Sequence, residues 1–147
     1  SLIIFLPLLG LIVEILLRQS GNIGIADFLR SAYSINCHQI PSRCPSFYGI
    51  PAILCHRCIG FYSGIIAGWT LSFIFGKGTS RRAMFFTLAA FAVNGVDVLG
   101  IGLSLWDWNY WMRFIFGFAA GIGPGYLVMV GLKEAKRRYL TESSDIR

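Results

Sequence analysis

Four long apolar segments constrain this chain more than any other feature of its sequence. They run over residues 2–17, 59–76, 83–105 and 110–132; residues 18–58 separate the first two, and short polar stretches separate the others. Hydrophobic residues make up 55% of the chain and charged residues only 14%, which leaves too little polar surface to cover a water-soluble core. We therefore predict an all-α, polytopic membrane protein with about four transmembrane helices.

The first apolar segment, Leu2 to Leu17, is shorter than the roughly 20 residues that cross a hydrocarbon core. Glu14 is its single charged residue, and the chain does not open with Met, so we expect further residues upstream of Ser1. A secretory signal is the alternative, but the segment lacks a basic start and a small-residue cleavage site. We interpret the segment as an anchored helix.

The region between the first two segments differs in composition from the spans. Over residues 25–35, apolar residues recur at helical spacing, which indicates an amphipathic helix along the membrane interface. Residues 36–58 hold three of the five prolines, all four cysteines and both histidines, a composition that opposes regular helix. We predict a Cys/His-rich loop there, within one transmembrane domain over 1–140 that is followed by a polar tail over 141–147.

Lysine and arginine residues beside the spans predict the orientation. If the last two spans form a hairpin, the basic groups within 77–82 and 133–138 share one side, which should be cytoplasmic together with the C-terminus. The Cys/His-rich loop and the aromatic residues of 106–111 then lie outside, although four arginines between 18 and 57 lie there too, against the rule. The net charge of +6 arises from residues that bracket apolar segments, so nucleic acid is not an expected partner.

The strongest chemical motifs lie in the predicted loop. They are Cys-His-Gln-Ile-Pro-Ser-Arg over 37–43 and Cys-His-Arg-Cys-Ile-Gly over 55–60. Zinc favours cysteine and histidine ligands, and a Cys-x2-Cys turn can present two sulfurs to one ion. We expect Cys37, Cys55 and Cys58 as sulfur ligands, with His38, His56 or Cys44 as the fourth ligand and His38 favoured.

Two other uses of these residues compete with a metal site. Four cysteines on an outward face could form two disulfides that staple the loop. Alternatively, Arg43 and Arg57 could lower the pKa values of Cys55 and Cys58 and create a thiol redox site. No histidine lies within a span for a bis-histidine haem, but His38 or His56 could ligate a pigment or haem near the surface.

Polar and small residues inside the spans predict helix contacts. Asn94 and Asp97 lie one turn apart, and folding the last hairpin brings Asp97 and Arg113 to similar depth. Unpaired charges there are costly, so we expect an ion pair, in a structural role rather than a proton relay. Glycines at every fourth position predict close helix packing, against each other or against a partner subunit. These glycines are Gly60, Gly64 and Gly68 on one span and Gly117, Gly121 and Gly125 on another.

At these residues the chain resembles a family of small bacterial and archaeal membrane proteins known as a domain of unknown function. The resemblance covers residues 33–125 and rests on the two cysteine motifs, on Asp97, and on Asn109 with Arg113 and Gly117. Family members resemble one another in having serine at the position of Cys44 and a small residue at that of His56. The resemblance therefore implies Cys37, His38, Cys55 and Cys58 as the ligand set, but it implies no reaction, and it points to a bacterial inner (plasma) membrane.

We expect the protein to be a small accessory or assembly subunit of a larger membrane complex, with a zinc-clipped loop capping its outer face. Lipid and other membrane subunits are its expected partners. The alternative is a membrane-bound thiol-redox or metal-dependent enzyme; a transporter would need more spans or oligomerisation. Motifs of phosphate-binding loops, zinc proteases and serine hydrolases are absent from the sequence, which favours a role without catalysis.

Overall fold

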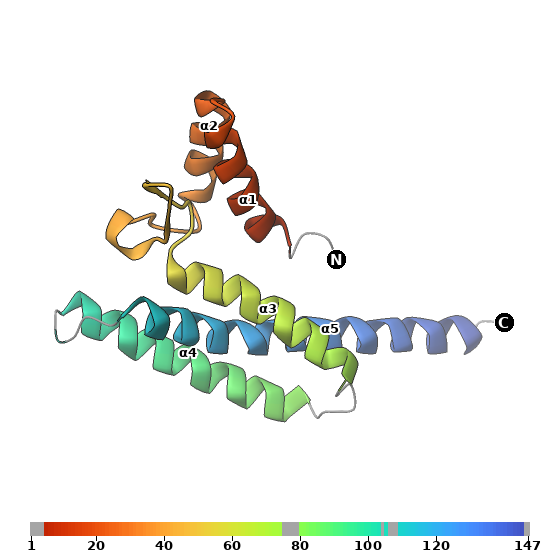
Figure 1. Ribbon diagram of the computed structural model, residues 1–147. Helices are drawn as coiled ribbons and strands as arrows, with labels where there is room; N and C mark the ends of the chain where they lie inside the picture. Colours follow the sequence, from red (N-terminus) through yellow and green to blue (C-terminus); the bar gives the residue numbers. More distant parts are fainter. Residues whose placement is uncertain (1–4, 75–79, 104, 106–108, 146–147) are drawn as a thin grey trace.

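The computed structural model describes residues 5–74, 80–103, 105 and 109–145, and its described part is mostly helical, as predicted. Five α-helices account for most of these residues (Figure 1). They are α1 (Leu6–Gln19), α2 (Ile23–Tyr33), α3 (His56–Ile74), α4 (Ser80–Gly102) and α5 (Tyr110–Asp145). The region between α2 and α3 holds a short 3-10 helix, η2 (Pro41–Arg43), and two strands, β1 (Ser46–Phe47) and β2 (Ile50–Pro51).

Three of the helices, α3, α4 and α5, lie side by side (Figure 1). α3 and α5 run in the same direction (Figure 1). α4 runs in the opposite direction, from the end of the bundle where α3 finishes back to the end where α5 begins. The chain between α2 and α3 therefore lies at the end of the bundle where α5 begins and α4 ends. This arrangement brings residues of all three helices next to the cysteine motifs.

The two glycine series meet each other. A methyl group built on any of these glycines would collide with the backbone of the facing helix, so α3 and α5 touch through their main chains. Gly60, Gly64 and Gly68 lie against the carbonyls of Phe114, Phe118 and Ile122, and Gly117, Gly121 and Gly125 lie against those of Arg57, Phe61 and Ile65. The sequence left open whether these faces meet each other or a partner subunit, and the structure places them against each other.

Two of the described helices are long and apolar enough to cross a membrane, over Met84–Gly102 and Tyr110–Arg137. Only 17% and 22% of these windows are buried, whereas the core helix of a soluble protein would be mostly covered. The expected count of four transmembrane helices is therefore not supported in the described part of the chain. α1 has only 14 residues, and α3 begins with the polar His56 and Arg57 and carries several small and hydroxyl side chains, which lower its hydropathy.

Several boundaries differ from the expected ones. α3 begins at His56 rather than at 59, because the Cys55 carbonyl already accepts a hydrogen bond from the Ile59 amide at 3.0 Å. α5 does not end near 132 but continues to Asp145, so the first part of the predicted polar tail is helical. Within the predicted loop, Tyr48 and Gly49 both have positive φ and form the two-residue turn between β1 and β2.

The first two helices form a hairpin held by a buried carboxylate. Glu14 is fully buried and accepts hydrogen bonds from Arg18 at 2.6 Å and from Arg30 at 3.2 Å. The Tyr33 hydroxyl donates to the Leu6 carbonyl at 2.9 Å and crosses over Gly10, where no side chain would fit. α1 and α2 are thereby fixed to each other, and the chain leaving α2 is directed toward α3.

Candidate metal or thiol site

Local backbone structure places the three cysteines of the site. Cys37 lies four residues after the end of α2, and its amide donates to the Tyr33 carbonyl at 3.0 Å. Gln39 then takes a left-handed conformation, φ 51°, and its side-chain amide donates to the Arg30 carbonyl at 2.7 Å, which turns the chain away from the helix. Cys55 precedes α3 and Cys58 lies in its first turn, so both sulfurs come from one helix start.

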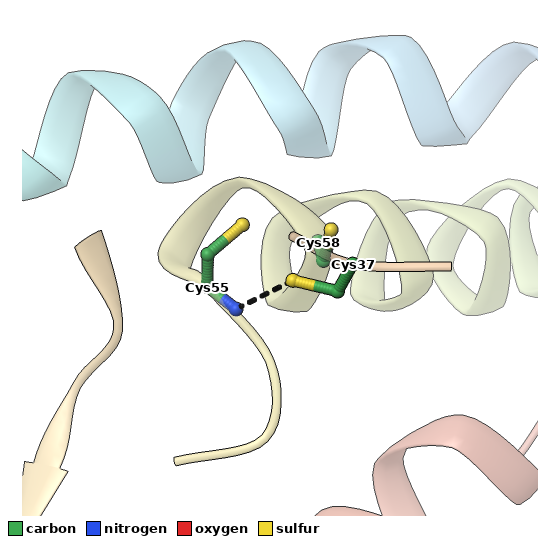
Figure 2. Close-up of side chains that lie close together, drawn as sticks. All are labelled: Cys37, Cys55 and Cys58. Carbon is green, nitrogen blue, oxygen red and sulfur yellow. Dashed lines mark hydrogen bonds between the residues drawn. The ribbon is translucent and has the colours of Figure 1, made fainter. Parts of the chain in front are cut away.

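The sulfurs of Cys37, Cys55 and Cys58 all lie within 4.8 Å of one another (Figure 2). The Cys55 backbone amide donates to the Cys37 sulfur at 3.3 Å, the contact drawn as a dashed line in Figure 2. Ile53 and Leu54 are fully buried beneath this group and, with Cys37, form a small apolar core. The contacts of Cys37 thus join the segment after α2 to the start of α3.

Hydrogen bonding within the group distributes its protons unequally. Side-chain hydrogen bonds from Cys55 and then Cys58 lower the pKa of the Cys37 thiol far below its ordinary value, against the opposing effect of burial. The same bond to Cys37 raises the pKa of Cys55. These hydrogen bonds favour the thiolate form of Cys37, and the thiolate is the form that binds metals and attacks electrophiles.

The other expected ligand candidates lie elsewhere. His38 is exposed and does not belong to the group of close ligand atoms, and His56 Nδ1 lies 3.0 Å from the Arg43 carbonyl while its ring contacts Tyr110. Cys44 is buried apart from the group, and burial raises its pKa to about 11. The structure therefore brings together three of the four residues expected as ligands. The four cysteines are free thiols rather than two disulfides.

A charge pair lies next to the sulfurs. Arg57, between Cys55 and Cys58 in sequence, forms a salt bridge with Asp97 of α4, whose side chain is only 4% exposed. Arg113 of α5 is buried as well, and Asn94 donates to the Phe116 carbonyl at 2.5 Å. Sequence reasoning missed Arg57 as a partner of Asp97. Its position in the first turn of α3, at the same end of the bundle as Asp97, was the available indication.

A cavity of about 380 Å³ opens beside the three sulfurs. Its wall combines the thiols with basic, polar and apolar side chains from the loop, α4 and α5. The principal lining residues are Cys37, Cys55, Cys58, His38, Gln39, Arg43, Arg57, Arg113, Val98 and Ile101. A ligand in this cavity would meet sulfur, guanidinium and aliphatic groups at once.

Comparison with known proteins places this arrangement in a wider group. A family model described as a predicted membrane protein, DUF2085, matches residues 37–127, which include the three cysteines, Asp97 and Arg113. An uncharacterized protein of Methanocaldococcus jannaschii, MJ1492, is 33% identical over 110 residues, which cover 71% of this chain and 69% of that relative. No solved structure matches the chain significantly.

Proposed function

This chain belongs to the DUF2085 family of predicted membrane proteins, as its motifs led us to expect, and we propose that it carries one metal ion, zinc in the first place, on Cys37, Cys55 and Cys58. The proposal depends on one observation, the mutual approach of three sulfurs within 4.8 Å. Tetrahedral zinc with bonds of about 2.3 Å separates its sulfur ligands by about 3.8 Å, so small side-chain movements would complete the site. The ion would fasten the segment after α2 to the start of α3.

The surroundings favour bound thiolates. The amide of Cys55 donates to the Cys37 sulfur, an interaction that stabilises negative charge on sulfur. Arg43, Arg57 and Arg113 line the adjoining cavity and offset part of the charge of three thiolates. The fourth position would be taken by His38, which lies next to Cys37 in sequence and lines the same cavity, or by a ligand from the cavity.

Metal content measured per chain tests this proposal. Protein purified without chelator should contain about one zinc per chain, and Cys37→Ser and Cys58→Ser should each lose most of it. Cys44→Ser is the matched control, because this cysteine is also buried but lies outside the group, and it should retain the metal. Metal-free wild-type protein, or full occupancy in the Cys58→Ser variant, would refute the site.

We propose that α3 is a third membrane span beside the two candidate spans, α4 and α5. α3 is packed against α5 from Gly60 to Gly68, and Lys133 of α5 donates to the Ser72 carbonyl at 2.7 Å. Because α5 is a candidate span, a membrane around it would enclose α3 as well. We place the cysteine site outside and the C-terminus in the cytoplasm of a bacterial inner membrane, following the positive residues. Labelling of Cys58 by an impermeant thiol reagent in metal-depleted intact cells would support the placement of the cysteine site on the outer side of the membrane.

The biological role that we propose is that of a small accessory or assembly subunit of a membrane complex. It is supported by the small size of the chain and by a site that orders one end of the bundle. The glycine faces no longer support it, because α3 and α5 cover each other's glycines. Migration of the detergent-extracted protein with a stoichiometric partner on a native gel is the expected result, and migration alone would refute the role.

A thiol-redox enzyme is the second candidate, and the cavity against the three sulfurs favours it. In that function Cys55 and Cys58 would become a disulfide by thiol–disulfide exchange, and a disulfide of the substrate would take up the two electrons and two protons and leave as two thiols. Replacement of Cys58 by serine should then abolish reversible oxidation of the protein. Unchanged redox behaviour in a folded Cys58→Ser variant would exclude this candidate.

A further inference from the structure

A second depression adjoins the cavity beside the sulfurs and shares part of its lining. It has a volume of about 510 Å³ and lies between α3 and α4, with part of its floor on α5. Four residues line both spaces: Asn36, Arg57, Cys58 and Val98. We call the first space the head cavity and the second the lateral groove. Since they share a wall, one elongated molecule could occupy both.

The head cavity has the chemistry of an anion site. Arg43, Arg57 and Arg113 line it, and guanidinium groups bind phosphate and carboxylate oxygens through paired hydrogen bonds. The side chain of Asp97 accepts from Arg57 at the edge of this cavity. Arg57 Nε is buried and has no hydrogen-bond partner among the described residues. The three guanidinium groups thus face the Asp97 carboxylate and the sulfur of Cys37.

The lateral groove has a different lining. Phe61, Tyr62 and Phe91 provide aromatic walls, and Ala120 lies in its floor. Gly95 of α4 borders the groove, and a carbon atom added there would meet nothing within 4 Å. Because α4 and α5 are the two candidate spans, this groove lies at membrane depth. Its polar lining consists of Asn36 and Arg57, which it shares with the head cavity, and Asn94, whose side chain donates to the Phe116 carbonyl. The aromatic part of the groove suits an apolar chain.

We propose that the head cavity and the lateral groove together bind one anionic phospholipid, with its phosphate among the arginines and an acyl chain along the groove between α3 and α4. The arginines of the head cavity, the aromatic side chains of the lateral groove and the four lining residues that the two spaces share support this occupant over a soluble anion. The proposal does not depend on a metal at the cysteines.

Native mass spectrometry of the full chain, released from neutral detergent after titration with phosphatidylglycerol or phosphatidylcholine, tests the site. Wild-type protein should retain one phosphatidylglycerol with roughly tenfold preference over phosphatidylcholine, because both lipids offer a phosphate but the arginines repel the quaternary ammonium of the choline group. Arg43→Gln should reduce this preference by roughly tenfold. Glycerol 1-phosphate, the soluble head group, should not displace the lipid at equal concentration.

A pair of glycine variants separates the groove from general lipid contact. Gly95→Leu places a side chain in the groove and should abolish retention of the lipid. Gly131→Leu is its control, because Gly131 also lies on a span with open space around it but does not border the groove. Equal unfolding temperatures of the two variants would show that both are folded.

Three results would overturn the proposal. They are equal retention of the two lipids by wild-type protein, wild-type binding by a folded Gly95→Leu variant, and displacement of the lipid by glycerol 1-phosphate, which would indicate a site for a soluble anion. Zinc content measured on the same samples keeps the two proposals apart. Lipid preference without zinc would refute only the metal site, and zinc without lipid preference would refute only the lipid site.

Discussion

Alanine in place of Gly64 would test whether α3 and α5 touch through their backbones. The added methyl group would collide with the Phe118 carbonyl and come within about 3.0 Å of the Gly121 Cα, and neither backbone atom can move away as a flexible side chain could. Forcing one extra carbon into a closely packed interface typically costs 1–3 kcal/mol. Separation of the helices would also weaken the Cα–H···O contacts that such glycine faces make, each worth roughly 0.5–1 kcal/mol. We therefore expect Gly64→Ala to lower the free energy of unfolding by about 1–3 kcal/mol.

Gly131→Ala provides the matched comparison. Gly131 lies in α5, and an added carbon there meets nothing within 4 Å. Alanine favours helix over glycine, so this variant should be unchanged or stabilised by up to about 1 kcal/mol. Unfolding in mixed detergent, followed by tryptophan fluorescence and circular dichroism, gives both values. Equal stability of the two variants would refute the packing of α3 on α5 described here.

Three further predictions follow from buried groups of the structure. Asp97→Asn leaves Arg57 without its buried carboxylate and should lower the free energy of unfolding by roughly 3–5 kcal/mol. In the same unfolding assay, the Arg57→Gln/Asp97→Asn double variant should lose less free energy of unfolding than the two single variants lose together. Glu14→Ala should separate α1 from α2 by leaving Arg18 and Arg30 without their shared acceptor, and proteolysis between the two helices should become faster. Burial raises the pKa of Cys44 from 9.0 to about 11, so the stability that this neutral thiol contributes is intact below pH 9 and is lost as the pH rises through 9 toward 11. The free energy of unfolding, measured from neutral pH to about pH 11, should therefore fall less steeply in Cys44→Ala than in the wild type. Identical slopes would contradict a buried thiol at this position.

Much of the helical architecture follows from the sequence because long apolar segments in a membrane protein have few alternatives to helix. The positions of α4 and α5 are of this kind. The start of α3 could not be predicted in the same way, since His56 and Arg57 resemble loop residues until their contacts are known. His56 lies against the Arg43 carbonyl and Tyr110, and Arg57 pairs with Asp97, so both polar side chains find partners at the start of a helix.

The candidate site was predictable in its sulfurs but less so in its surroundings. The spacing of Cys55 and Cys58 places both at one helix start, and Cys37 is the first cysteine after the preceding helix, four residues past its end. Arg57 was a harder partner of Asp97 to find, because depth along the hairpin of α4 and α5 points to Arg113 and carries no information about α3. The pairing of Asp97 with Arg113 stays a prediction. Tertiary packing of α3 against the other helices brings Arg57 to Asp97.

α5 is a single helix of 36 residues, about 54 Å long at 1.5 Å per residue, and it continues past the end of α3 (Figure 1). A short isolated peptide with the sequence of the part of α5 beyond α3 would be a poor helix in water, because the first helical turn is costly to nucleate. Here the packed part of α5 has already made that turn, so each further residue only elongates an existing helix. The C-terminal part of α5 therefore extends from the bundle as a stiff rod, and its end keeps a fixed direction that a flexible tail could not keep.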